Sequence, residues 1–91
     1  MGYEEKARVL LALANPVRLK IVEILLSSKR PVHIEGIARI LKMDYASVYR
    51  HVDRLKKAGI LDVHEVGRSR VPYIIKKEEI ENFLGHLNTL L

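Results

Sequence analysis

The stretch from Met43 to Gly59 reads Met-Asp-Tyr-Ala-Ser-Val-Tyr-Arg-His-Val-Asp-Arg-Leu-Lys-Lys-Ala-Gly. On a helical period of about 3.6 residues, Val48, Val52 and Leu55 fall on one side. The opposite side is covered by Ala46, Ser47, Arg50, Asp53, Arg54 and Lys57. The pattern predicts a helix that packs into a core on one face and presents a polar, basic surface on the other.

The residues at both ends of this stretch predict where the helix begins and ends. Asp44 is expected to cap the N-terminus by accepting a hydrogen bond from the Ser47 backbone N–H, and its charge suits the positive end of the helix dipole. Gly59 is expected to close the helix, because glycine adopts the left-handed conformation at little cost. Lys42, Met43 and Asp44 form a short connection to the preceding element.

Three further helices are predicted before this stretch. The first covers about Tyr3–Leu13, where apolar residues repeat at helical spacing. Asn15 and Pro16 end it and start the second, since Asn is a favoured N-cap and Pro is tolerated at the first helical position. The third lies within Val32–Leu41, where four apolar residues follow the i, i+3, i+4, i+7 pattern.

After Gly59 the hydrophobic period changes from helical to alternating. Residues 61–66 and 71–75 are predicted to form two strands, separated by Gly67-Arg68-Ser69-Arg70 as a basic tip. Pro72 cannot donate to a strand ladder and therefore indicates an edge strand. From about residue 77 the helical period returns and continues to the C-terminus.

Composition limits the possible functions. The 91 residues are expected to form one domain, 1–91, with a net charge of +5. Residues 39–70 carry eight Lys and Arg against four Asp and Glu, so most of the positive charge lies in and around the quoted stretch. A basic surface of this kind suits a polyanionic partner.

The sequence also lacks the usual signs of several other classes. It contains no cysteine, no Gly-rich phosphate loop and no His-x-x-x-His pair, so no thiolate or catalytic zinc site is expected, and no enzymatic activity. No apolar run reaches membrane-spanning length. The expected location is the cytoplasm, in association with the nucleoid. His51, at the edge of the apolar face, is interpreted as a partly buried structural histidine.

Four helices, a two-stranded hairpin with a basic tip and a closing helix give the order α-α-α-α-β-β-α. This is a mainly α (α+β) fold and the order of a winged helix-turn-helix. In such a domain one helix enters the major groove of double-stranded DNA, and cations on flanking elements hold the phosphates. The helix 45–58 is predicted to be the reading helix, and the tip 67–70 to lie on the minor groove or backbone.

Two sets of DNA-contacting residues follow from this placement. The residues predicted to read bases are Tyr45, Ala46, Ser47, Tyr49, Arg50 and Arg54. Those predicted to contact the backbone or to act in the wing are Lys42, Lys56, Lys57, Arg68, Ser69 and Arg70. Tyr45 and Tyr49 could stack on sugar or meet a thymine methyl, or pack on the flank of the protein, and the two wing arginines could be ordinary turn charges.

The sequence resembles the ArsR-type winged-helix transcription regulators over about residues 5–76. The resemblance is carried by residues 13–21 (Leu-Ala-Asn-Pro-Val-Arg-Leu-Lys-Ile), by Ile37-Ala38, by residues 48–61 and by Gly67-Arg68. It implies a homodimer, formed largely by the terminal helices, that binds a roughly two-fold symmetric operator and represses transcription. Many members release DNA when a metal ion binds.

This chain departs from the metal-binding patterns of that family. The segment 33–38, where relatives carry a thiolate site, has no cysteine, and Glu79, Glu81 and His86 only loosely echo a second site on the last helix. No metal and no other cofactor is therefore expected. Tyr49 stands where relatives often have a small hydroxyl residue, so the sequence preference of relatives does not transfer.

The terminal helices, about 3–13 and 77–91, are predicted to form the dimer interface. The interface residues expected are Tyr3, Ala7, Leu10, Leu11, Ile80, Phe83, Leu84, Leu87 and Leu91. The alternative is that one helix covers the other within a monomer. Two other functions fit the same order of elements: a winged-helix module that binds a protein of the transcription machinery, and a sequence-neutral architectural DNA binder.

Overall fold

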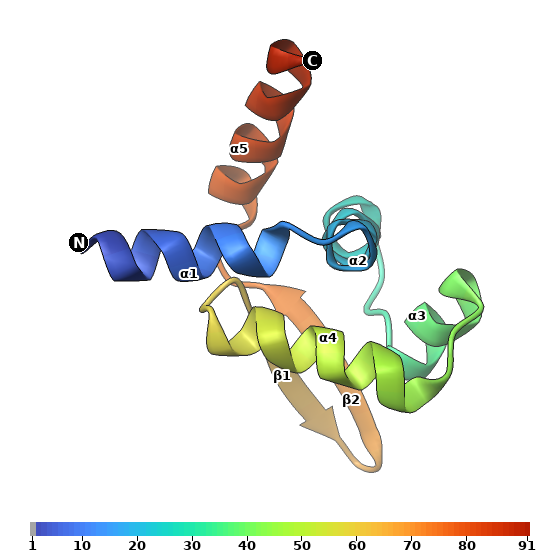
Figure 1. Cartoon of the computed structure of the whole chain (residues 1–91). Helices are drawn as coiled ribbons and strands as arrows, with labels where there is room; N and C mark the ends of the chain where they lie inside the picture. The colour runs from blue at the N-terminus through green and yellow to red at the C-terminus, as the bar shows by residue number, and fades with distance from the viewer. Residues whose placement is uncertain (1) are drawn as a thin grey trace.

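The computed structural model describes residues 2–91, and its order of elements is the predicted one (Figure 1). The elements are α1 (Tyr3–Leu13), α2 (Pro16–Ser27), α3 (Ile34–Leu41), α4 (Tyr45–Lys57), β1 (Leu61–Val66), β2 (Ser69–Ile74) and α5 (Lys77–Leu90). Helices α1 to α4 and the hairpin form the body, while α5 leaves it and points away (Figure 1). This arrangement is a winged helix-turn-helix, as the sequence predicted.

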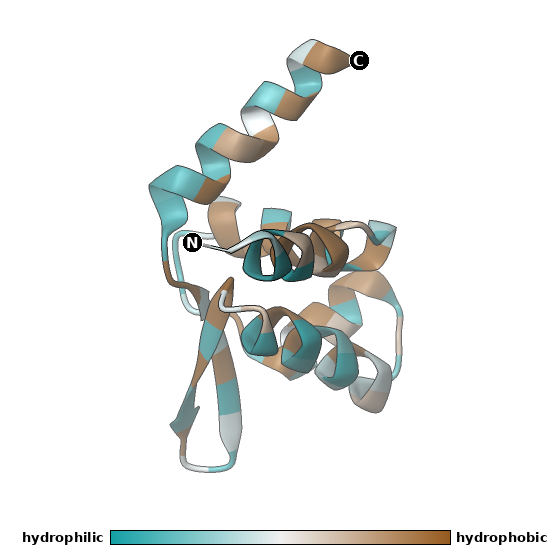
Figure 2. Cartoon of the chain, turned by 60° about the vertical axis from the view of Figure 1, so that its left-hand side comes forward, coloured by the Kyte–Doolittle hydropathy of each residue, from teal (hydrophilic) through white to brown (hydrophobic). Residues whose placement is uncertain are grey.

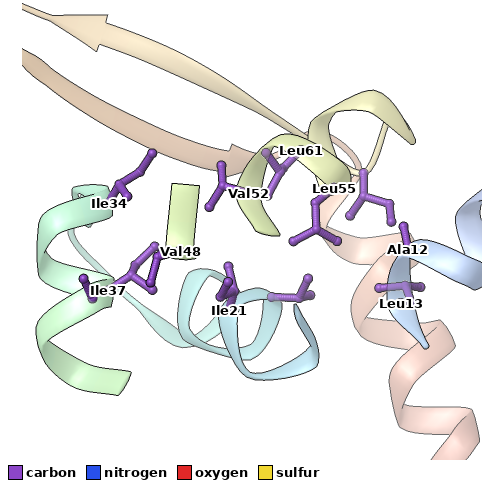
Figure 3. Close-up of a cluster of buried hydrophobic side chains, with 12 residues drawn as sticks. Ala12, Leu13, Ile21, Ile34, Ile37, Val48, Val52, Leu55 and Leu61 are labelled. Atoms are coloured by element: carbon purple, nitrogen blue, oxygen red, sulfur yellow. The ribbon is translucent and has the colours of Figure 1, made fainter. Parts of the chain in front are cut away.

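A hydrophobic core lies where the end of α1, α2, α3, α4 and the start of β1 meet (Figure 3). Val48, Val52 and Leu55 of α4 are at most 1% exposed, which confirms the predicted inner face of this helix. Ile21 and Ile37 reach the same core from α2 and α3. Burying a side chain of this size contributes about 1.5–3 kcal/mol, so the core fixes the rotation of α4 about its axis.

The connection between α3 and α4 is tight because α3 ends in a left-handed residue. Lys42 has a φ of 56°, and the Met43 backbone N–H donates to the Ala38 carbonyl over 3.0 Å. This pattern closes the helix in the way that a C-terminal glycine usually does. Here a lysine occupies the position, at a steric cost that glycine would not have.

The ends of α4 follow the predicted capping. Asp44 accepts from the Ser47 backbone N–H over 3.0 Å at the N-terminus. At the C-terminus Gly59 has a φ of 80°, and its N–H donates to the Lys56 carbonyl while that of Ile60 donates to the Leu55 carbonyl. Both bonds together form a Schellman motif, which directs the chain into β1.

The hairpin is tighter than the sequence indicated. Val66 pairs with Ser69, so the turn consists of Gly67 and Arg68 alone, and the predicted four-residue break is wrong. Gly67 has a φ of 61°, which suits the first central position of a two-residue hairpin turn. Ser69 and Arg70 are consequently strand residues, and the Arg70 side chain lies on the face of the hairpin that Glu65 shares.

The terminal helices leave wide apolar faces uncovered. In α1 only Ala12 and Leu13 are buried, whereas Tyr3 and Leu11 are 87% and 66% exposed. Helix α5 contributes no buried residue, and Figure 2 shows apolar and polar segments alternating along it where it stands clear of the body. Two members of the predicted dimer interface, Ile80 and Leu84, also pack partly against the core of their own chain.

Replacing Lys42 with glycine is expected to stabilise the protein. Glycine removes the steric cost of the left-handed backbone at this position but loses more entropy on folding, so the net gain in unfolding free energy should be about 0.5–1 kcal/mol. Urea denaturation followed by circular dichroism measures this difference.

The control for this substitution is Lys42→Ala, which removes the same charge and keeps the Cβ that causes the cost. It should show no gain in stability. Equal midpoints for the glycine and alanine variants would contradict a steric cost at Lys42.

Candidate nucleic-acid interface

The outward side of α4 carries a chain of hydrogen bonds that begins at its cap. The Ser47 hydroxyl donates to Asp44 Oδ1 over 2.7 Å, and Arg50 Nη2 donates to the same Ser47 hydroxyl over 3.2 Å. The hydrogen bonds from Ser47 lower the pKa of the Asp44 carboxyl. The Arg50 side chain is therefore held along the exposed side of the first two turns, beside the exposed Ala46.

Tyr45 and Tyr49 lie one helical turn apart and face the hairpin. Their ring centroids are 6.4 Å apart, and Arg70 of β2 reaches both rings. Arg70 Nη1 donates to the Tyr45 hydroxyl over 3.2 Å, and its Cζ lies 4.8 Å from the centroid of the Tyr49 ring. The hydrogen bond to Tyr45 raises the pKa of Arg70. Both tyrosines contact Arg70 on the flank of the protein, and both remain partly exposed, at 40% and 37%.

The remaining predicted DNA-contacting cations differ in whether a carboxylate already neutralises them. Lys57 Nζ lies 2.9 Å from Asp53, and Lys56 Nζ lies 3.8 Å from Asp62. Within residues 2–91, no ion pair is formed by Lys42, Arg50, Arg54 or Arg68. Among these predicted cations, those without an ion pair thus lie on the α3–α4 connection, the outer side of α4 and the hairpin turn.

A groove separates α4 from the hairpin. Its lining residues come from α3, α4 and both strands: Ile34, Tyr49, Val52, Asp53, Lys56, Val63, Glu65 and Arg70. The lining combines the apolar Ile34, Val52 and Val63 with two acidic and two basic side chains.

Comparison with known proteins identifies the family. The family model HVO_A0114 matches residues 13–80, about three quarters of the chain. An uncharacterized HTH-type transcriptional regulator of Methanocaldococcus jannaschii is 34% identical over 76 residues, covering 82% of this chain and 78% of that protein. The chain belongs to the HVO_A0114 family.

Solved structures similar to this HVO_A0114 family member share its fold. One is the homodimeric winged helix-turn-helix DNA-binding domain of a possible ArsR-family transcriptional regulator from Mycobacterium bovis, with a TM-score of 0.81 and 25% identity over 96% of this chain and 78% of that one. A transcriptional regulator homologue from Pyrococcus horikoshii OT3 has a TM-score of 0.75 and 29% identity, with 96% and 93% of the two chains covered. The resemblance to ArsR-type regulators is confirmed, and these relatives are regulators, not enzymes.

Two further properties of this HVO_A0114 family member concern metal binding and membranes. Across residues 2–91, His, Asp and Glu side chains do not gather into a group of three or more that could hold a metal ion, and this includes Glu79, Glu81 and His86. The helices of the same described part are each too short or too polar to cross a membrane.

Sequence reasoning missed Arg18, which joins α1, α2 and α4. Arg18 Nε donates to the Ala12 carbonyl over 2.6 Å, and its Nη1 lies 3.1 Å from His51 Nδ1. Burial, followed by the charge of Arg54, lowers the pKa of Arg18. Since an arginine only donates, His51 must accept through Nδ1 and is neutral in this arrangement. His51 is thus a partly buried structural histidine, as the sequence predicted, and Arg18 is the partner that the sequence did not reveal.

We expect the protein to lose stability as the pH falls below about 6.5, the ordinary pKa of histidine. Burial, and then the charges of Arg18, Arg50 and Arg54, lower the pKa of His51 in the folded protein. The unfolded chain therefore takes up the proton first, so this contribution is complete above pH 6.5 and is lost as the pH falls through the folded pKa. Urea midpoints between pH 7.5 and 5 measure the loss.

The variant His51→Gln provides the comparison, because its amide oxygen can accept from Arg18 but has no proton to gain. Its urea midpoint should change less over the same pH range. The other three histidines, His33, His64 and His86, are exposed and remain in both proteins. An identical pH dependence of the two proteins would assign the effect to groups other than His51.

Proposed function

We propose that this protein is a sequence-specific, double-stranded DNA-binding regulator that acts as a homodimer and represses transcription. The observation that carries the proposal is the outer side of α4, where Arg50 and Arg54 form no ion pair with any residue of the described part, 2–91. The inner side of the same helix is fully buried, so the arginines have a fixed direction. The similarity of the chain to an HTH-type transcriptional regulator, at 34% identity, supports the same conclusion.

In this proposal α4 lies in the major groove, which is about 12 Å wide and admits one helix. Arg50 is the main base-reading residue, since its guanidinium can bond guanine O6 and N7 together. Ala46, Ser47 and Arg54 lie on the same side and contact neighbouring bases. Tyr49 contributes from the edge of the helix next to the hairpin.

Phosphates are bound by cations on both sides of α4. Lys42 on the α3–α4 connection and Arg68 in the hairpin turn carry uncompensated charge, so they contribute most, with Arg68 on the minor groove or the adjacent backbone. Ser69, next to the turn, contributes a hydroxyl donor toward the DNA backbone. Lys56 and Lys57 contribute less, because each already lies near a carboxylate of its own chain.

The homodimer is proposed to form through α1 and α5. Leu11 and Leu87 are 66% and 37% exposed in the single chain, and an apolar groove lined mainly by Val9, Leu10, Leu13, Ile80 and Phe83 joins the two helices. A face of this kind is costly to leave in water. The M. bovis relative is homodimeric, which supports the same arrangement here. A dimer presents two copies of α4, so a two-fold symmetric operator is expected.

Arg50→Ala should weaken binding to the cognate operator by about 1–3 kcal/mol and relax the preference at one base position, while random duplex binding changes little. The operator is first selected from genomic fragments with the purified protein. Equilibrium titration of labelled cognate and random duplexes at several salt concentrations then measures both affinities.

These titrations also separate the other two functions. Equal losses on cognate and random duplex would contradict base reading by Arg50. If an excess of bulk DNA displaces the protein from every selected site, the protein is a sequence-neutral architectural binder. No binding at low salt, or binding without salt dependence, would contradict the DNA-binding proposal and favour a protein-interaction module.

Leu87→Glu is expected to convert the homodimer into monomers, because it places a charge in the apolar surface that two chains would bury. The monomer should remain folded, since α5 has no buried residue. Sedimentation velocity measures the mass in solution.

Ile40→Glu is the matched control, because Ile40 is also an exposed apolar residue, 59% exposed, but lies on α3. It should leave the dimer intact. A wild-type protein that sediments as a monomer, or a Leu87→Glu variant that remains dimeric, would contradict the proposed interface.

A further inference from the structure

We propose that Arg70 is a positioning residue, and not a DNA contact: it fixes the hairpin against the first two turns of α4 and so sets the distance between the base-reading side chains and the hairpin turn. This inference rests on the proposed function and assigns a different role to a residue that the sequence placed on the DNA backbone. It concerns the Arg70 cluster, which consists of Tyr45, Tyr49, Glu65 and Arg70.

The guanidinium of Arg70 has a protein partner on three sides. Nη1 donates to the Tyr45 hydroxyl over 3.2 Å, and Cζ lies 4.8 Å from the Tyr49 ring centroid. Nε lies 3.7 Å from Glu65 Oε1, on the residue that pairs with Arg70 across the two strands. The planar guanidinium therefore donates a hydrogen bond, stacks on a ring and pairs with a carboxylate within its own chain. A lysine cannot make these three contacts together.

Arg68 shows what an arginine of the same hairpin looks like without such partners. It lies in the turn, it is exposed, and within residues 2–91 it forms no ion pair. Glu65 reduces the attraction of Arg70 for a phosphate, whereas nothing comparable acts on Arg68. The two arginines, two residues apart, thus have different surroundings and are expected to have different roles.

The position of Arg70 along the hairpin explains why the link matters. Leu61 and Ile74 hold the base of the hairpin in or against the core, but Val66 near the turn is 62% exposed. The cluster is a cross-connection between the outer half of the hairpin and α4. Val63 and Val71 hold the middle of the hairpin against the body. Without the cluster the part of the hairpin beyond them would move more freely relative to Arg50, and the spacing of the two DNA contacts would be less fixed.

Arg70→Lys tests the role because it keeps the charge and removes the fork. Binding to the cognate operator should weaken about tenfold, because misplaced base contacts lose their discrimination, while random duplex binding and its salt dependence stay unchanged. Arg68→Lys is the matched control and should change cognate binding by no more than about twofold, since a lysine also neutralises phosphate. Equal effects of the two variants would overturn the proposal.

A double-mutant cycle asks whether Arg70 acts through Tyr45. Tyr45→Phe removes only the hydroxyl that accepts from Arg70 and should weaken cognate binding in the same direction. The double variant should bind no more weakly than Arg70→Lys alone, because both changes break one link. Losses that multiply in the double variant would show independent contacts and overturn the proposal.

A measurement without DNA separates this inference from the proposed function. NMR relaxation of the Gly67 and Arg68 backbone amides should show lower order parameters in Arg70→Lys than in the wild type, with the Val48 amide unchanged as an internal reference. Unchanged order at the turn would overturn the link. If the wild-type protein binds no DNA, the proposed function is contradicted. The order parameters of Gly67 and Arg68 would then still test whether Arg70 holds the hairpin turn.

Discussion

The burial of one side of α4 constrains what its other side can do. Val48, Val52 and Leu55 are almost completely removed from water, and rolling the helix to expose them would cost about 1.5–3 kcal/mol for each side chain. The helix therefore has one rotational setting, and Arg50 has one direction. The caps at Asp44 and Gly59 act on the same constraint, because they fix where α4 enters and leaves the core.

Positive charge on this small domain serves two different purposes. Arg18 and Arg70 are used inside the chain: the first joins the end of α1 to α4 through His51, and the second joins the hairpin to α4 through two tyrosines. Arg50 and Arg68 have no carboxylate partner in the described chain and lie outward. The net charge of +5 thus includes arginines that are engaged within the protein and contribute less to the attraction of a polyanion.

The terminal helices show how a short chain handles apolar surface that its own core cannot cover. Helix α1 buries Ala12 and Leu13 in the core but leaves Leu10 and Leu11 largely exposed, at 53% and 66%. Helix α5 has one apolar side, of which Leu84 near its middle reaches the body only partly. Exposed apolar faces of this kind are typical of surfaces that associate with another protein chain, in agreement with the proposed homodimer.

The sequence by itself determined the order of the elements, the caps of α4 and its buried side. These features depend on periodicity and on interactions between residues a few positions apart, which the sequence states directly. Only the tertiary structure decided which arginines are free. The Arg70–Tyr45 bond spans 25 positions and the Arg18–His51 bond spans 33, and no local pattern predicts which distant side chains meet.

The same reason explains why the hairpin turn differed from expectation. The turn is two residues long because Val66 pairs with Ser69, a register that depends on how the strands meet the core. Periodicity likewise identified the apolar side of α5, but not the partial packing of Ile80 and Leu84 against the core of their own chain. What a side of a helix contains is local information, whereas what covers it is decided when the elements pack.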